Sequence, residues 1–221
     1  MSEHRNLTGV SLHEPKGVAA ASAETYYKAN GSGSGTWSPL FPLSTTVGDD
    51  YVVPIVGANA AGIKPPGLVK VNDNGAGSTG VYYYGFDAST EEEVFFTIQL
   101  PHRVKAGTGI RPHIHWGPVN ANAGNVVWGL EYCISNVGEA ASNTTIITAT
   151  GAAPGALRTQ VITSFPEIAG TDIRESTLLN CRFFRKAADA LDTYAADAVA
   201  MSFDIHFQVE KLGSIEEYPG A

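Results

Sequence analysis

The sequence predicts a mainly β protein, an antiparallel β-sandwich of jelly-roll type preceded by an extended N-terminal arm. Short runs of β-branched and aromatic residues recur after residue 48, and 24 glycines and 12 prolines supply turns between them. The run 200–212 alternates apolar and polar side chains, which is typical of a half-buried antiparallel strand. Residues 1–48, in contrast, show no sustained period.

The arm, residues 1–48, is expected to fold only against something else. Its few apolar residues are separated by Gly, Pro, Ser and Ala, and NGSGSG at 30–35 has the composition of a flexible linker. Such a segment buries too little apolar surface to offset the entropy lost on ordering. We therefore expect a docking arm followed by a body at 49–221, and the alternative for the arm is a disordered tail.

The first half of the body contains five predicted strands separated by turn residues, and the first four are rich in Val, Tyr, Phe or Ile. They cover residues 50–57, 68–73, 81–89, 92–100 and 111–118. GAGSTG, just before the third strand, fits the spacing of a nucleotide-binding loop. Such a loop opens a helix, whereas a strand run follows here, so we expect a hairpin turn.

The second half contains five more strands, of which the first and the last alternate most clearly between apolar and polar residues. They cover residues 125–135, 144–151, 158–165, 176–185 and 200–212. The Ala-rich stretch 185–198 could form a short helix or a loop. Eight or more short strands with turns between them are typical of a sandwich, and the jelly roll is the topology we expect.

Composition excludes several classes of protein. The net charge is −8 and the 14 Lys and Arg residues are scattered, which argues against nucleic acid as a partner. The N-terminus has no apolar signal region and no apolar run reaches the length of a membrane helix, so we expect a soluble protein made in a cytoplasm. Cys133 and Cys181 lie far apart, without a CxxC motif, and are expected to be buried free thiols.

His113 and His115 are the main candidates for chemistry, because residues two apart share one face of a strand. With Gly107 they resemble the opening of the first cupin motif, whose two histidines and a later glutamate bind metal. The glutamate is missing, since Val119 and Asn120 occupy its two possible positions. The pair is therefore expected to be structural, hydrogen-bonded or at a subunit contact.

A metal site remains the alternative reading of this pair, with His102, Glu131 or His206 as third ligand. We expect Glu91–Glu93 to form a solvated strand edge. The aromatic run 82–86 is expected to divide between core and surface rather than to form a sugar platform. No catalytic, cofactor-binding or metal-binding residue is assigned, and no enzyme activity is expected.

The N-terminal sequence NLTGVSLHEPKGVAAASAETYYKANGSGSGTW resembles a module at the start of virion proteins of tailed bacteriophages. There, a segment like LHEPKG, a few small residues, a short extended piece and a GSGTW-like turn precede a variable β-rich body. ETYYKA at 24–29 is more polar than the extended piece of that module. LPHRVKAGTGIRPHIHW and FDIHFQVEKLGSIEEY, in the body, also resemble phage structural proteins.

This resemblance implies a capsid cement (decoration) protein or head fibre, commonly a jelly-roll homotrimer. Such a protein is made in the bacterial host cytoplasm, sits on the outer capsid surface and grips the major capsid protein with its arm, without cofactor, nucleic acid or membrane. Alternatives are a phage fibre or adsorption protein that binds host surface glycan and, third, a cupin-like metalloprotein. The expected partner-binding residues are Leu7, Leu12, His13, Glu14, Pro15, Lys16 and Trp37.

Overall fold

The computed structural model describes residues 25–29, 32, 35–39, 47–60 and 64–215. The chain divides into two compact units, Met1–Thr46 and Val47–Ala221. The sequence-based boundary was placed after residue 48, whereas the first strand of the second unit begins at Val47.

The described part of the first unit is a hairpin of β1 (Thr25–Ala29) and β2 (Gly35–Pro39). Tyr27 faces Trp37 across the two strands, with their ring centroids 5.4 Å apart in an edge-on arrangement. A Cβ atom at Gly35 would lie within 2.3 Å of the Lys28 carbonyl oxygen, so this position requires glycine. The hairpin thus depends on one aromatic pair and on a close backbone approach.

The described part of the second unit contains ten strands, each overlapping one of those predicted from the sequence. They are β3 (Val47–Pro54), β4 (Gly67–Asn72), β5 (Val81–Phe86), β6 (Glu93–Gln99), β7 (Arg111–Pro118), β8 (Ala123–Ser135), β9 (Thr145–Pro154), β10 (Val161–Ser164), β11 (Leu178–Arg185) and β12 (Ala198–Val209). Two 3-10 turns, η4 (Ile55–Gly57) and η5 (Gly170–Asp172), interrupt the loops. No helix among the described residues is long and apolar enough to cross a membrane.

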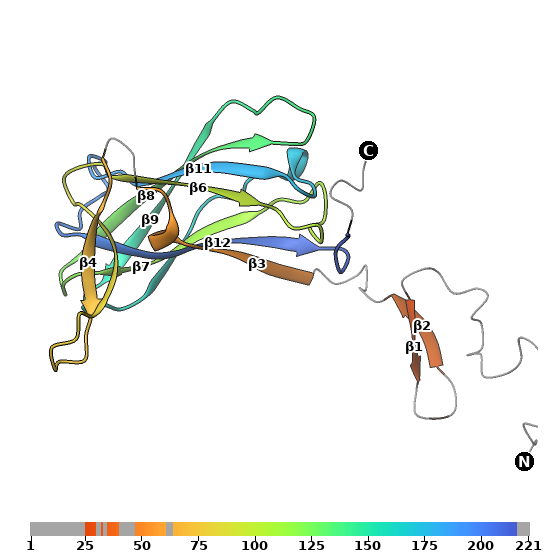
Figure 1. The fold of residues 1–221 in the computed structure, drawn as a ribbon, viewed down its shortest axis with the longest axis horizontal. Helices are drawn as coiled ribbons and strands as arrows, with labels where there is room; N and C mark the ends of the chain where they lie inside the picture. The colour runs from red at the N-terminus through yellow and green to blue at the C-terminus, as the bar shows by residue number, and fades with distance from the viewer. Residues whose placement is uncertain (1–24, 30–31, 33–34, 40–46, 61–63, 216–221) are drawn as a thin grey trace, which may run out of the picture. The chain divides into compact units, whose positions relative to one another are not determined.

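The strands form two antiparallel sheets (Figure 1). The larger has the order β10-β7-β12-β5-β4, with β3 also beside β12, and the smaller has the order β6-β11-β8-β9. If β5 to β12 are counted as strands 1 to 8, the two sheets read 1-8-3-6 and 2-7-4-5. That order is a jelly roll, which confirms the predicted topology.

Aromatic side chains fill the space between the two sheets. Trp128 of β8 stacks on Phe183 of β11 with centroids 5.1 Å apart, and Phe86 of β5 meets both rings edge-on. Trp116 of β7 closes the group from the larger sheet, 5.9 Å from Trp128. These four side chains are fully buried, so strands from both sheets contribute to one continuous core.

Residues 186–197 of the Ala-rich stretch form a loop between β11 and β12, and Arg185 explains why. This fully buried guanidinium donates hydrogen bonds to the backbone carbonyls of Phe86, Tyr194 and Ala196. It also binds the Asp192 carboxylate, at 2.7 and 3.0 Å. The Tyr194 and Ala196 carbonyls of the loop therefore accept from a side chain, whereas in a helix they would accept from the backbone.

We predict that Arg185→Ala destabilises the body strongly, because it leaves the buried Asp192 carboxylate and three carbonyls without this donor. Breaking a buried pair in this way costs about 3–5 kcal/mol. The free energy of unfolding in urea measures the effect. In the control, Arg111→Ala removes an exposed pair with Glu167 and should cost at most about 1 kcal/mol. Equal urea concentrations at the unfolding midpoint of the two variants would contradict the prediction.

Candidate functional site

The first candidate site lies on the outer face of the larger sheet, where β7 and β12 run side by side. Ile114 of β7 points into the core, so His113 and His115 point outward. On β12, Phe203 points inward and Asp204 outward by the same alternation. The register pairs Asp204 with His113, which brings the carboxylate beside both imidazoles.

Three ligand atoms of this site converge on one point. Asp204 Oδ2 lies 3.1 Å from His113 Nε2 and 3.1 Å from His115 Nε2, and the two Nε2 atoms are 3.2 Å apart. Ser202 Oγ donates to Asp204 Oδ1 at 2.8 Å, and the Gln160 side-chain amide lies 2.6 Å from His115 Nδ1. Ser202 and Gln160 thus contact Asp204 Oδ1 and His115 Nδ1. Asp204 Oδ2 and the two Nε2 atoms face one another.

The site is largely shielded from water although it lies on the outside of the sheet. His113 and Asp204 are each 7% exposed. Burial lowers the pKa of His113 from its ordinary value, and the Asp204 carboxylate opposes part of this effect. An open groove of about 600 Å³ leads to the cluster, and Arg111 and Glu167 form an ion pair at its edge.

The sequence offers three candidates for a third metal ligand, and each of them makes other contacts. His102 lies 3.0 Å from the Ser214 carbonyl oxygen, and Glu131 binds Arg182. His206 packs edge-on against His113, with centroids 4.5 Å apart, but its Nε2 atom meets Asp50. Asp204 takes the position of the third ligand, and it was not among the candidates predicted from the sequence. The alternation of 200–212 already placed it on the outer face, but only the pairing of β12 with β7 brings it beside the histidines.

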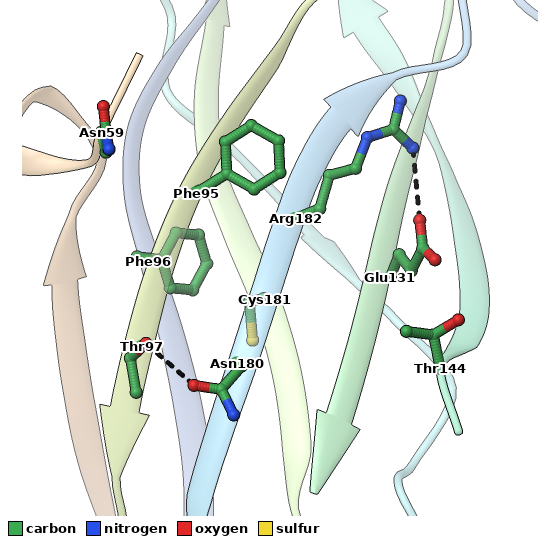
Figure 2. Close-up of a pocket in the computed structure, with 9 residues that line it drawn as sticks. All are labelled: Asn59, Phe95, Phe96, Thr97, Glu131, Thr144, Asn180, Cys181 and Arg182. Atoms are coloured by element: carbon green, nitrogen blue, oxygen red, sulfur yellow. Dashed lines mark hydrogen bonds and ion pairs between the residues drawn. The ribbon is translucent and has the colours of Figure 1, made fainter. Parts of the chain in front are cut away.

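A second candidate site is a hollow of about 590 Å³ on the smaller sheet (Figure 2). Phe95 of β6, Arg182 of β11 and Glu131 of β8 are register neighbours and form a row across three strands. Phe95 is 37% exposed, and Arg182 Nη1 lies 3.5 Å from Glu131 Oε2. The row therefore offers one apolar ring beside two charged groups.

Polar groups continue this site along the strands. Thr97 Oγ1 donates to Asn180 Oδ1 at 3.1 Å, as Figure 2 shows, and Asn180 Nδ2 donates to Ser135 Oγ at 3.1 Å. Their fixed orientation, next to an exposed ring, suits a small ligand that has both an apolar face and hydroxyl groups.

The glutamates at 91–93 are expected from the sequence to form a solvated strand edge, and the structure corrects the solvated part of this prediction. β6 is an edge strand, as expected, but Glu91 and Glu93 are half-buried and form ion pairs with Arg182. Glu92 is also half-buried, and its carboxylate accepts the backbone N–H of Asp87 at 2.8 Å. The cluster thus anchors one arginine and the turn before β6, because Arg182 pairs with Phe95, two residues beyond Glu93 on the same face of β6.

The aromatic runs divide between core and surface, as predicted. Phe86 and Trp128 are fully buried, whereas Tyr82 is 39% exposed. Trp128 is thus unable to serve as a sugar platform, and the exposed ring beside the hollow in Figure 2 is Phe95.

Of the expected partner-binding residues, only Trp37 falls within the described part of the chain. It is half-buried in β2 against Tyr27. The other six lie outside the described residues: Leu7, Leu12, His13, Glu14, Pro15 and Lys16.

Comparison with known proteins gives distant structural likenesses. No protein-family model matches the chain, and no curated protein matches it. The carbohydrate-binding module CBM35 from Cellvibrio japonicus Abf62 is 12% identical with a TM-score of 0.37, covering 73% of this chain and 99% of that one. The module TmCBM61, solved with β-1,4-galactotriose, is 16% identical with a TM-score of 0.30, covering 73% and 88%.

A structure of infectious bursal disease virus, Gx strain, is 10% identical with a TM-score of 0.37. The match covers 80% of this chain but 35% of the viral chain. Likenesses at this level carry no argument about what the protein binds. The assignment to the jelly-roll class of β-sandwiches therefore rests on the strand order itself.

We predict that the two thiols differ sharply in reactivity. Cys181 points into the core, and burial raises its pKa to about 12, whereas Cys133 is half-buried on the outer face of β8. At pH 8 a thiol with such a pKa is ionised in about one molecule in ten thousand. Iodoacetamide should therefore label native Cys181→Ser once per chain and native Cys133→Ser hardly at all. Rapid labelling of native Cys133→Ser would contradict this, and both variants should react fully in urea.

Proposed function

We propose that this protein is a non-enzymatic capsid cement protein that binds the outer surface of a bacteriophage head. In this proposal the N-terminal unit docks on the major capsid protein, and the jelly-roll body forms a homotrimer on the shell. The observation that carries the proposal is the division of the chain into two units, of which one is the jelly-roll sandwich and the other has a two-stranded hairpin in its described part.

The described hairpin supports a docking role for the N-terminal unit. Its strands have five residues each, and one Tyr–Trp pair joins them. An isolated two-stranded hairpin is at best marginally stable in water, so it needs a further surface to pack against. Tyr26, 44% exposed, offers an aromatic side chain for such a surface.

The sequence around Pro15 supports the same role. Proline stiffens an extended peptide, and Glu14 and Lys16 carry opposite charges that can pair across an interface. The whole chain is acidic, which suits a position outside the shell and away from packaged DNA. A homotrimer would match the local three-fold positions of an icosahedral shell, since trimers are among the common closed symmetries.

We predict that deletion of residues 1–37 abolishes binding to shells of the major capsid protein from the same virus, because it removes the docking segment. Co-sedimentation measures bound protein, and thermal disruption of the shells measures cementing. In the full-length chain, Trp37→Ala should weaken binding by at least about tenfold, as removal of an interface aromatic does.

Tyr82→Ala is the matched control, because it removes an exposed aromatic side chain from the body. It should bind shells as the unchanged protein does. Decoration by the arm-deleted protein at full occupancy would refute the proposal. A loss of binding for Tyr82→Ala but not for Trp37→Ala would place the binding surface on the body instead.

A second candidate function is glycan binding by the hollow on the smaller sheet, as in an adsorption protein. The observation that favours it is Phe95, exposed beside Arg182, Glu131 and Asn180 in one open hollow (Figure 2). An aromatic ring flanked by hydrogen-bonding side chains suits the apolar face and the hydroxyl groups of a sugar.

If this second function holds, the unchanged protein binds glycans on an array of bacterial surface polysaccharides, and Phe95→Ala loses those signals. The ring provides the apolar contact, so its removal should weaken binding by at least about tenfold. Ile162→Ala removes an apolar side chain that is even more exposed, 58% against 37% for Phe95, from the other sheet, and should retain the signals. An array without signals above background would reject this function.

A further inference from the structure

We propose that His113, His115 and Asp204 bind one divalent transition-metal ion per chain. This inference goes beyond the proposed capsid function and does not depend on it. Each of the three side chains offers one ligand atom, and these atoms all lie within 4.8 Å of one another. They come from two neighbouring strands whose register holds them in place.

The dimensions of the cluster fit a coordinated ion. The three ligand atoms form a nearly equilateral triangle with sides of 3.1, 3.1 and 3.2 Å. Ligands about 2.05 Å from a metal are about 2.9 Å apart in an octahedral cis arrangement and about 3.3 Å apart in a tetrahedral one. The observed sides lie between these two values, so an ion could be bound with little movement of the side chains.

Hydrogen bonding alone explains the three short contacts of the cluster less completely than a bound metal ion does. Each Nε2 atom can donate a proton to Asp204 Oδ2, but each ring then has no lone pair at Nε2. The contact of 3.2 Å between the two Nε2 atoms would then bring two N–H groups face to face. With a metal ion bound, all three atoms direct lone pairs at the ion, and all three short contacts are explained together.

The surrounding groups have the arrangement of an outer coordination shell. A histidine that binds metal through Nε2 carries its proton on Nδ1 and donates it to a neighbour. The Gln160 side-chain amide lies 2.6 Å from His115 Nδ1, and a half-turn of the amide places its oxygen there. Ser202 Oγ holds Asp204 Oδ1, so Asp204 Oδ2 is oriented toward the histidines.

The donor set defines the class of ion. Two imidazoles and one carboxylate suit Zn²⁺, Fe²⁺, Mn²⁺ or Co²⁺ rather than the oxygen-only ligation that Ca²⁺ prefers. The side chain of His115 is 19% exposed, and the groove of about 600 Å³ opens beside it. Further coordination positions are therefore accessible to water or to a group from a partner.

The test is a titration of the untagged, full-length protein with Zn²⁺ alone. Native mass spectrometry should show one ion per chain. Long-range ¹H–¹⁵N spectra of the imidazoles should show the Nε2 signals of His113 and His115 moving on Zn²⁺ addition, while those of His102 stay in place. Co²⁺ in place of Zn²⁺ should give visible absorption bands that Zn²⁺ then removes.

Single substitutions show whether Zn²⁺ binds at this cluster or at another histidine. Asp204→Asn and His115→Ala should weaken Zn²⁺ binding by more than about 100-fold, because even outer-shell partners change metal affinity by 10- to 100-fold. Gln160→Ala should weaken it by about tenfold. His206→Ala is the matched control, since its ring touches His113 but its own Nε2 atom meets Asp50. It should bind Zn²⁺ within about threefold of the unchanged protein.

Two results would overturn the inference. One is the absence of bound Zn²⁺ and Co²⁺ in the unchanged protein at free ion concentrations of about 100 μM. The other is binding that leaves the His113 and His115 signals unmoved, which would place the ion elsewhere. The spectra of the unchanged protein decide the matter even if a ligand variant fails to fold. Neither result bears on capsid binding, which is measured with shells.

Discussion

The pairing of β12 with its neighbours is the constraint on which the rest of the body depends. One edge of β12 pairs with β7 from Ala198 to His206, while β5 and β3 share its other edge. Its inward side chains, Phe203 and Ile205 among them, face the core and meet rings from the smaller sheet. Its outward side chains include Asp204, so the same register builds both the core and the candidate metal site.

The outer faces of the two sheets differ in chemistry. The larger sheet carries a shielded cluster of two imidazoles and a carboxylate, with no exposed Phe, Tyr or Trp ring among the residues that line its groove. The smaller sheet carries an exposed ring and an arginine that binds three glutamates. A jelly roll permits this because every strand has one face in the core, which leaves the other free to vary.

Much of the fold could be predicted from the sequence because the signals are local. Alternation in 125–135 and 200–212 reports which side chains face the core, and Gly, Pro, Asn and Asp mark the turns. The stretch 185–198 was ambiguous since its composition favours a helix. Arg185 decides the outcome through carbonyls as distant as Phe86, and no local pattern contains that information.

The sequence by itself determined the ten strands, the jelly-roll class and the two histidines that share a face of β7. The tertiary structure alone decided that Asp204, and not His102, Glu131 or His206, stands between those histidines. It likewise placed Phe95, Arg182 and Glu131 in one row across three strands. The physical reason is that side-chain period is a property of one strand, whereas a site depends on which strands pair and in which register.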